Sequence, residues 1–300
     1  MTYDIALSTM WAVGRFPDLA GFFDAGRELG FARFELNHAI DSAMLAGLSL
    51  DGTITGIHEP CPADISTAEL SRRNWLISAP DEKDRRRGVL ATRRSIDLAY
   101  ALGAPAVIVH PGRVDVDPAL ESALVDLHKA GRSSQPEYDQ TKARLMAART
   151  ARARTNMQSV RRSLIELAGY AAHRGIRLGL ENRFHYREIP LPDELEELLD
   201  LGLGQAVGYW HDIGHAQVLE HLGFDPHEEW LRRFADRMIG VHLHDVVGVT
   251  DHLPAGSGEV DWAMVRGYLP AGVLRTCEFQ SSHPPQQVAA GLHWLVDKRI

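Results

Sequence analysis

The chain has 300 residues, of which 45% are hydrophobic and 24% charged, and its formal net charge is −8. This composition is that of an ordinary globular protein with enough apolar side chains for a sizeable core. The negative charge argues against a protein that grips duplex DNA over a broad surface, because such proteins present basic faces to the phosphates. We therefore expect a small-molecule partner rather than a nucleic acid.

Cysteine content and apolar segment length bear on the cellular compartment. Cys61 and Cys277 lie far apart and form no C-x-x-C motif, which favours a reducing compartment over a disulfide-bonded secreted protein. The N-terminus contains no basic segment followed by a long apolar one. No apolar stretch approaches the roughly 20 residues that span a bilayer. The sequence therefore predicts a cytoplasmic protein without a membrane partner.

Short β-forming segments alternate with longer helical patterns along the chain, which predicts repeated βα units around a parallel sheet. Eight strands without a Gly-rich nucleotide loop favour a closed (β/α)₈ TIM barrel, one domain over residues 1–300, rather than a doubly wound sheet. The predicted strands are 4–8, 32–36, 53–58, 106–110, 177–181, 206–211, 238–243 and 274–279. The predicted helices are 19–29, 86–102, 159–173, 192–201, 228–234, 262–268 and 285–297.

Three segments interrupt this rhythm, and each of them follows a strand. Residues 70–87 form a polar connection, residues 113–156 a helical insertion after the fourth strand, and residues 246–261 a long loop with three glycines. In a barrel, the loops after the strands build the active-site face, so these segments are candidate lids or substrate walls. Residues 142–162 contain seven basic residues and no acidic one, and we interpret this run as a solvated helix face.

Seven of the eight predicted strands end in side chains able to bind a metal ion. The carboxyl ends of barrel strands converge on one mouth, so these groups are expected to face one another. Crowded carboxylates and imidazoles need a cation between them, and mixed oxygen and nitrogen ligands suit zinc, manganese or cobalt. The strand-end groups are Glu35, His58, His110, Glu181, Asp212, His215, His242, His244, Asp245, His252 and Glu278.

Each of these residues alone also has a structural explanation. A single strand-end histidine is more often a hydrogen-bonded loop residue, Glu35 is a weak candidate, and His244 and Asp245 are explained as well by capping of the strand end. The metal prediction depends on four consecutive strands ending in Glu181, Asp212, His242 and Glu278. No role is predicted for His38, His128, His173, His185, His221, His227, His283 and His293.

Several short motifs occur in order along the chain: HPG (110–112), LENR (180–183), D-x-x-H (212–215), HLHD (242–245), GSGEVDW (256–262) and the glutamate of the last strand. Together they resemble the xylose isomerase-like barrel superfamily. This superfamily contains sugar isomerases and epimerases and the apurinic-site endonucleases. The resemblance implies one divalent ion, often manganese, on Glu181, Asp212, His242 and Glu278. It also implies that His215 contacts substrate oxygens and that the two glutamates act as acid and base.

The endonuclease branch of the superfamily uses a trinuclear zinc cluster with additional histidines. The matching residues in this chain are His58, His110, His215 and His252. The family has an aspartate two residues before the last of these histidines, where this chain has Thr250, and Asp251 lies one residue late. The number of ions therefore stays open, with zinc or manganese expected and cobalt or magnesium as alternatives.

The first functional hypothesis is a metal-dependent isomerase or epimerase that converts a sugar or sugar phosphate through an enediolate. Glu181, Glu278 and His215 would be its catalytic residues. His58 and His110 would contact the substrate, and Arg183 and Arg113 are candidate ligands for a phosphate or carboxylate. For each arginine, a surface ion pair is the alternative. The resemblance also suggests a homo-oligomer.

The second hypothesis is an apurinic-site endonuclease with a multinuclear zinc cluster. The additional histidines and the basic run favour it, whereas the net charge, Thr250 and the scarcity of basic residues in 4–53 argue against it. Two further alternatives are a non-catalytic barrel and another enolisation enzyme, such as a dehydratase or an aldolase-type lyase. The small-molecule isomerase is the preferred hypothesis.

Overall fold

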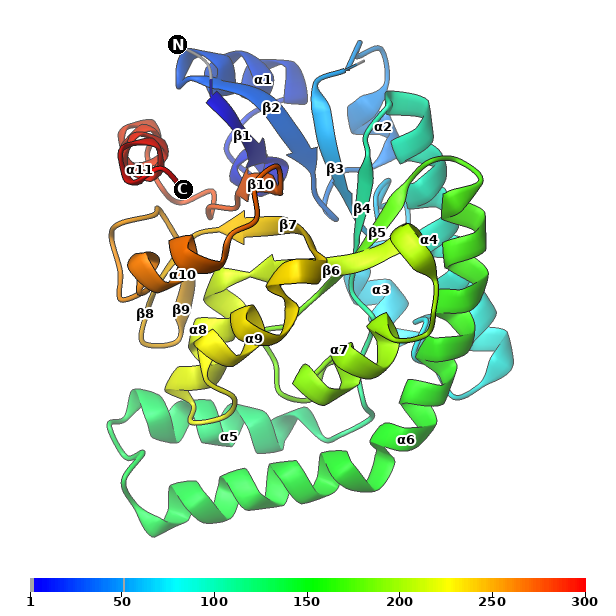
Figure 1. Ribbon diagram of the computed structural model, residues 1–300, viewed down its shortest axis with the longest axis vertical. Coiled ribbons are helices and arrows are strands. Elements are labelled where there is room, and N and C mark those ends of the chain that lie inside the picture. The colour runs from blue at the N-terminus through cyan, green and yellow to red at the C-terminus, as the bar shows by residue number, and fades with distance from the viewer. Residues whose placement is uncertain (1–2, 51) are drawn as a thin grey trace.

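The computed structural model describes residues 3–50 and 52–300, and this part of the chain forms a closed barrel of eight parallel strands surrounded by helices (Figure 1). The strands follow one another around the barrel in chain order, and the last one, β10, closes on β1. The predicted TIM barrel is therefore confirmed. The barrel strands are β1 (Tyr3–Ser8), β2 (Phe31–Leu36), β3 (Ile54–His58), β4 (Ala106–Val109), β5 (Arg177–Glu181), β6 (Val207–Asp212), β7 (Met238–Leu243) and β10 (Leu274–Cys277).

Each predicted strand agrees with an observed one to within two residues at either end, whereas the helices differ more. The α-helices are α1 (Leu19–Glu28), α2 (Ser42–Leu45), α3 (Thr67–Arg72), α4 (Glu82–Leu102), α5 (Pro118–Lys129), α6 (Pro136–Ala172), α7 (Pro192–Leu199), α8 (Ile213–His221), α9 (His227–Phe234), α10 (Trp262–Tyr268) and α11 (Pro285–Lys298). Short 3₁₀ turns are η1 (Thr9–Ala12), η2 (Gly204–Ala206) and η3 (Ala235–Arg237). None of the helices in the described part of the chain has the length and apolar character needed to cross a membrane.

Sequence reasoning missed helix α8, which starts directly at the end of β6. Asp212 caps it, since its side chain accepts a hydrogen bond from the His215 N–H at 2.7 Å. All seven residues from Ile213 to Leu219 are buried. A helix that is buried on every side has no alternation of polar and apolar faces, and that alternation is the main sequence signal for a helix.

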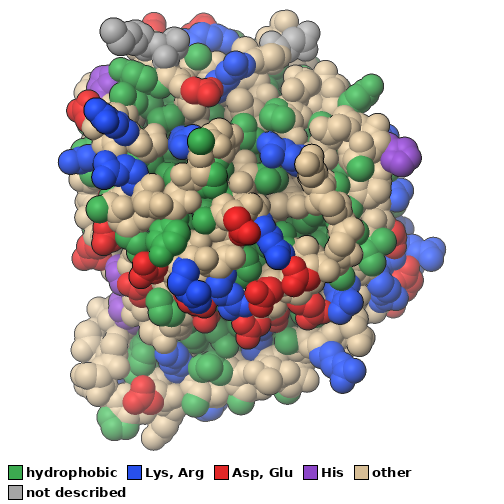
Figure 2. All heavy atoms as spheres, viewed as in Figure 1, with side chains coloured by type: hydrophobic (Ala, Val, Ile, Leu, Met, Phe, Trp, Pro, Cys, Tyr) green, Lys and Arg blue, Asp and Glu red, His purple; other side chains and the backbone are tan. Residues whose placement is uncertain are grey.

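Residues 113–156 form α5 and the first part of α6. Helix α6 has 37 residues, about 55 Å at 1.5 Å per residue, and it joins the basic run to the predicted helix 159–173. Both α5 and the first half of α6 run along the bottom of Figure 1, beneath the barrel. Five of the seven basic residues in the run are exposed, as a solvated face requires, but Arg149 is buried and paired with Glu194 at 2.6 Å. Figure 2 shows acidic and basic side chains mixed in a band across the lower half of one face.

Residues 246–261, predicted as a loop, contain a two-stranded antiparallel hairpin of β8 (Asp245–Val247) and β9 (Thr250–Leu253). The segment 70–87 likewise holds the end of α3 and the start of α4 instead of being wholly irregular. These differences all lie in the connections after the strands, at the barrel mouth. The interior just below the mouth is filled by the fully buried Trp210 indole. Gly179 and Gly240 leave room for it, because a Cβ on either would lie 2.8 or 2.1 Å from that ring.

Candidate metal centre

The four residues predicted to hold an ion meet around one nitrogen atom at the barrel mouth. His242 Nδ1 lies 2.9 Å from Glu181 Oε1, 3.4 Å from Asp212 Oδ2 and 3.2 Å from Glu278 Oε2. All four side chains are at least 98% buried. Tetrahedral ligand atoms at about 2.0–2.2 Å from a zinc ion stand about 3.3–3.6 Å apart. The separations from His242 Nδ1 are close to this range.

One oxygen of this cluster is buried without a hydrogen-bond donor. Asp212 Oδ1 accepts from the His215 N–H and lies 2.9 Å from His244 Nε2. Asp212 Oδ2 has no hydrogen-bond partner among the described residues. An unsatisfied buried carboxylate oxygen is costly, and a cation removes that cost. The donor set of three carboxylates and one imidazole therefore fits a divalent metal ion.

Glu35 supports the cluster from behind. His242 Nε2 lies 3.2 Å from both carboxylate oxygens of Glu35, which is fully buried at the end of β2. A carboxylate on the far nitrogen of a metal-binding imidazole orients the ring and raises its basicity. Sequence reasoning ranked Glu35 as a weak candidate. Its place at a strand end was the only available signal, because the partner, His242, lies 207 residues away.

The electrostatics of the cluster favour binding of a positive charge. Burial would raise the pKa of Glu181, but the Arg183 guanidinium and His110 hold it well below its usual range. Burial would likewise raise the pKa of Asp212, but His215 and His244 hold it well below its usual range. The pKa of His242 lies well above its usual value, because Glu278 and Glu35 outweigh the effect of burial. The negative charge of the carboxylates thus favours a proton on His242, and it would equally favour a metal ion bound among the same groups.

A second group of ligands lies on the other side of Glu181. Glu181 Oε2 is 2.6 Å from His110 Nε2 and 3.6 Å from His58 Nε2, and the two imidazole nitrogens are 3.2 Å apart. Arg183 Nη1 lies 2.5 Å from both Glu181 Oε2 and His110 Nε2. The predicted Arg183 is therefore inside the cluster.

A third group consists of His215, Asp251 and His252. His215 Nδ1 lies 3.0 Å from the Asn182 carbonyl and donates to it, so His215 Nε2 is free to accept and lies 3.9 Å from Asp251 Oδ2. In a regular strand, Asp251 and His252 would point to opposite faces. His252 adopts a left-handed backbone with φ of 57°, and both side chains face the cluster. Asp251 therefore lies beside His215 in the cluster, whereas the Thr250 side chain is exposed.

His244 ties this hairpin to the main cluster. Its Nδ1 accepts from the His252 N–H at 2.9 Å, so its proton lies on Nε2 and is donated to Asp212 Oδ1. The His244 and His252 rings stack with centroids 4.3 Å apart. Gly214 leaves the space for the His244 ring, since a Cβ there would lie 2.0 Å from its Cε1.

Asp245 organises the loop that follows. Its carboxylate accepts hydrogen bonds from the backbone N–H groups of Val246, Gly256 and Val260 and from the Trp262 indole, at 3.0, 2.8, 3.2 and 3.0 Å. Asp245 is fully buried. It therefore folds the loop 246–261 against the end of β7.

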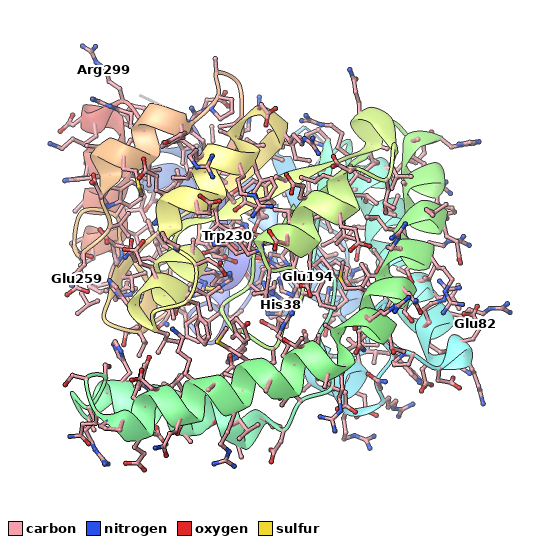
Figure 3. All side chains as sticks on the ribbon, turned by 60° about the horizontal axis from the view of Figure 1, so that its bottom comes forward. His38, Glu82, Glu194, Trp230, Glu259 and Arg299 are labelled. Carbon is pink, nitrogen blue, oxygen red and sulfur yellow. The ribbon has the colours of Figure 1, made fainter. Side chains whose placement is uncertain are left out.

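His38 is a site residue that sequence reasoning missed. Its ring packs edge-on to His58, with centroids 5.1 Å apart, and burial together with His58 lowers its pKa to about 4. In Figure 3, His38 lies near the centre of the view, whereas Glu82, Glu259 and Arg299 lie at the rim. Its only sequence signal is that it follows β2 by two residues.

Arg113, the other predicted anion ligand, lies apart from the carboxylate cluster. Its guanidinium donates to Ser71 Oγ and, at 2.9 Å, to the Ser71 carbonyl. It lines a pocket of about 90 Å³ that also includes His110 and Glu188. This pocket adjoins the second ligand group through His110.

Comparison with known proteins identifies the family. Residues 23–298 match the model of the xylose isomerase-like TIM barrel. The chain belongs to this family. A curated relative, the uncharacterized protein y4fM of Sinorhizobium fredii, is 24% identical over 210 residues, which are 70% of this chain and 56% of the relative. The match thus spans little more than half the length of that relative.

Solved structures share the fold of this barrel. A D-tagatose 3-epimerase-like protein matches with 18% identity, a TM-score of 0.66, and coverage of 98% of this chain and 96% of its own. A 3-keto-D-glucoside 4-epimerase from E. coli matches with 17% identity, a TM-score of 0.64 and coverage of 99% and 100%. The IolI protein with a zinc atom matches with 13% identity, a TM-score of 0.65 and coverage of 99% of both chains.

Proposed function

We propose that this protein is a divalent-metal-dependent isomerase or epimerase that converts a sugar or sugar phosphate through an enediolate. The observation that carries the proposal is the grouping of Glu181, Asp212 and Glu278 around His242 Nδ1, with Asp212 Oδ2 buried and lacking a donor in the described structure. The matched epimerases support a carbohydrate substrate. Zinc or manganese suits the ligand set, and the zinc-containing relative in fold supports zinc.

A divalent ion held by Glu181, Asp212, His242 and Glu278 would supply Lewis-acid stabilisation of negative charge on the substrate oxygens. Glu181 and Glu278 provide the proton transfers. The charges of Arg183 and His110 lower the pKa of Glu181, and those of His242 and His252 lower the pKa of Glu278, in both cases against the effect of burial.

Both glutamates are therefore ionised at neutral pH, as the base that takes the substrate proton must be. One carboxylate removes the proton beside the carbonyl and becomes a carboxylic acid, which returns the same proton to the neighbouring carbon in an isomerisation. In an epimerisation the second glutamate first takes up a proton from solvent and then delivers it to the opposite face of the intermediate. His215, with Nε2 free to accept, binds a substrate hydroxyl. His58 and His110 line the same mouth and contact the substrate from the other side of Glu181.

Deuterium exchange tests this function without knowledge of the product. The zinc- or manganese-loaded protein is incubated in D₂O with D-tagatose, D-fructose, D-allulose, L-ribulose and their phosphates, and NMR follows the hydrogen beside the carbonyl. We expect at least one ketose to exchange. Glu278→Gln should slow the exchange by about 10²–10⁴-fold, as loss of an acid–base group does.

Glu28→Gln is the matched control, because Glu28 is exposed on α1, and we expect it to exchange at the wild-type rate. Elemental analysis should find close to stoichiometric metal in the active protein. A purified protein that neither contains nor takes up metal, or a Glu278→Gln variant with full exchange, contradicts the proposal.

The apurinic-site endonuclease stays as a second candidate, because further ligand groups around His58 and His110 and around His215, Asp251 and His252 lie beside the first. Clustered ions suit phosphoester hydrolysis. Incubation with a duplex that contains one abasic site separates the two functions. Efficient strand cleavage that disappears in Glu181→Gln would establish the nuclease instead.

A further inference from the structure

The two carboxylate oxygens of Glu181 contact different groups of residues. Its Oε1 faces His242 in the first cluster, and its Oε2 faces His110 Nε2 and His58 Nε2. Two imidazole nitrogens and a carboxylate oxygen at 2.6, 3.2 and 3.6 Å from one another form a donor set for a divalent ion. These donor atoms would therefore suit a second ion at the barrel mouth, and Glu181 would be shared between the two ions.

The Arg183 guanidinium already lies in that place. Its Nη1 is 2.5 Å from Glu181 Oε2 and 2.5 Å from His110 Nε2. A zinc ion on the same two atoms would sit about 2.0–2.2 Å from each. The ion and the N–H group would need the same lone pairs and nearly the same space, so one excludes the other.

Arg183 lies between the carboxylates of Glu181 and Glu188, and its Nε has no hydrogen-bond partner among the described residues. It is only two residues beyond the end of β5, and its side chain is 13% exposed. Its Nε lies 3.5 Å from Glu188 Oε2, and that oxygen accepts from the His185 N–H at 3.4 Å. An arginine side chain stays protonated throughout the physiological pH range. Arg183 is therefore a permanent cation facing a buried carboxylate.

We propose that Arg183 takes the place of a second divalent ion, so that Glu181 bridges one metal ion and one guanidinium. This inference rests on the metal centre proposed above. A guanidinium can donate hydrogen bonds to an enediolate oxygen or a substrate hydroxyl. It cannot bind and activate a water molecule as a second metal ion does in phosphoester hydrolysis. The substitution therefore suits enolisation of a sugar and disfavours the nuclease reaction.

Metal stoichiometry tests this proposal directly. The protein is stripped of metal, reloaded with Zn²⁺ and dialysed, and zinc per chain is measured for wild type, Arg183→Met, His110→Ala and the double variant. We expect Arg183→Met to bind one zinc more than wild type. His110→Ala alone should bind as much as wild type, and the double variant should lose the additional ion.

Arg187→Met is the matched control, because Arg187 lies in the same loop, is 19% exposed, and pairs with Glu121 at 3.2 Å instead of with Glu181. It should not change the zinc content. Cobalt gives a second readout: two Co²⁺ ions that share Glu181 couple magnetically. The electron paramagnetic resonance signal per ion should therefore fall in Arg183→Met and not in wild type.

A loss of one zinc in His110→Ala alone would overturn the proposal, because it would place an ion beside Arg183 in the wild type, and this result does not require the Arg183 variant to fold. Unchanged zinc content in a folded Arg183→Met would also overturn it. Both outcomes leave the first metal site intact. A wild-type protein that binds no zinc would defeat this proposal together with the metal centre.

Discussion

Replacement of Gly214 by alanine tests whether His244 holds the metal centre and the hairpin together. A Cβ at this position would lie 2.0 Å from His244 Cε1 and 2.5 Å from Nδ1. Gly214 lies inside α8, where alanine is otherwise favoured over glycine. The ring must therefore move, and His244 loses its hydrogen bonds to Asp212 Oδ1 and to the His252 N–H.

Overpacking of a buried site costs about 1–3 kcal/mol, and a hydrogen bond to a charged group contributes about 1.5–3 kcal/mol. We expect Gly214→Ala to lower the free energy of unfolding by about 3–5 kcal/mol in urea denaturation. Gly169→Ala is the control, because Gly169 lies inside α6 and its Cβ would meet nothing within 4 Å. This variant should gain about 0.5–1 kcal/mol.

A double-mutant cycle isolates the cause. If the clash is with the His244 ring, Gly214→Ala should cost much less in a His244→Ala background than in wild type, and the two effects should be strongly non-additive. Additive effects would show that the cost arises elsewhere. A Gly214→Ala variant with wild-type stability and wild-type metal affinity would refute the geometric reasoning.

Three further predictions concern the loop, the thiols and the metal. Asp245→Asn should lower the free energy of unfolding by about 2–4 kcal/mol and expose residues 246–261 to proteolysis, and an unchanged digestion pattern would contradict this role. Burial raises the pKa of Cys61 to about 12 and that of Cys277 further, so neither thiol should react with DTNB until the protein unfolds. A fast reaction of either thiol in the folded protein would contradict this prediction. Because carboxylates raise the pKa of His242 against the effect of burial, zinc must displace a proton. Zinc affinity should therefore fall as pH falls, and calorimetric heats should vary with the buffer; buffer-independent heats would exclude proton release.

The barrel and the grouping of the four strand-end side chains could be predicted because both follow from simple sequence rules, whereas their role as metal ligands stays a prediction. Strand ends converge in a TIM barrel, so the residue type at each end indicates its chemistry without further knowledge. Glu181, Asp212, His242 and Glu278 obeyed this rule. Helix α8 could not be recognised, because burial of its first seven residues on every side removes the periodic pattern on which recognition depends.

The residues that sequence reasoning missed depend on contacts between distant segments. The role of Asp251 stayed open in the sequence, because Asp251 is one residue out of step with the family pattern and only a local shift of the backbone could bring it into place. The left-handed backbone at His252 changes the direction of the side chains, and the sequence does not signal it, since positive φ is uncommon for non-glycine residues even though histidine adopts it more often than most. His38 was ignored because a loop histidine has no periodicity, and only the fold brings it to His58.

The ligand inventory alone does not separate the two candidate functions, because both use the same carboxylates and imidazoles. What distinguishes them is the charge beside Glu181 Oε2. A second metal ion there would add two positive charges and a site for bound water, whereas Arg183 adds one charge and only hydrogen-bond donors. An enediolate needs its negative oxygens stabilised and water kept away from the reacting carbon. A hydrolase needs the opposite, a water held and activated beside its substrate, so the proposed role of Arg183, two residues beyond the end of β5, favours enolisation over hydrolysis.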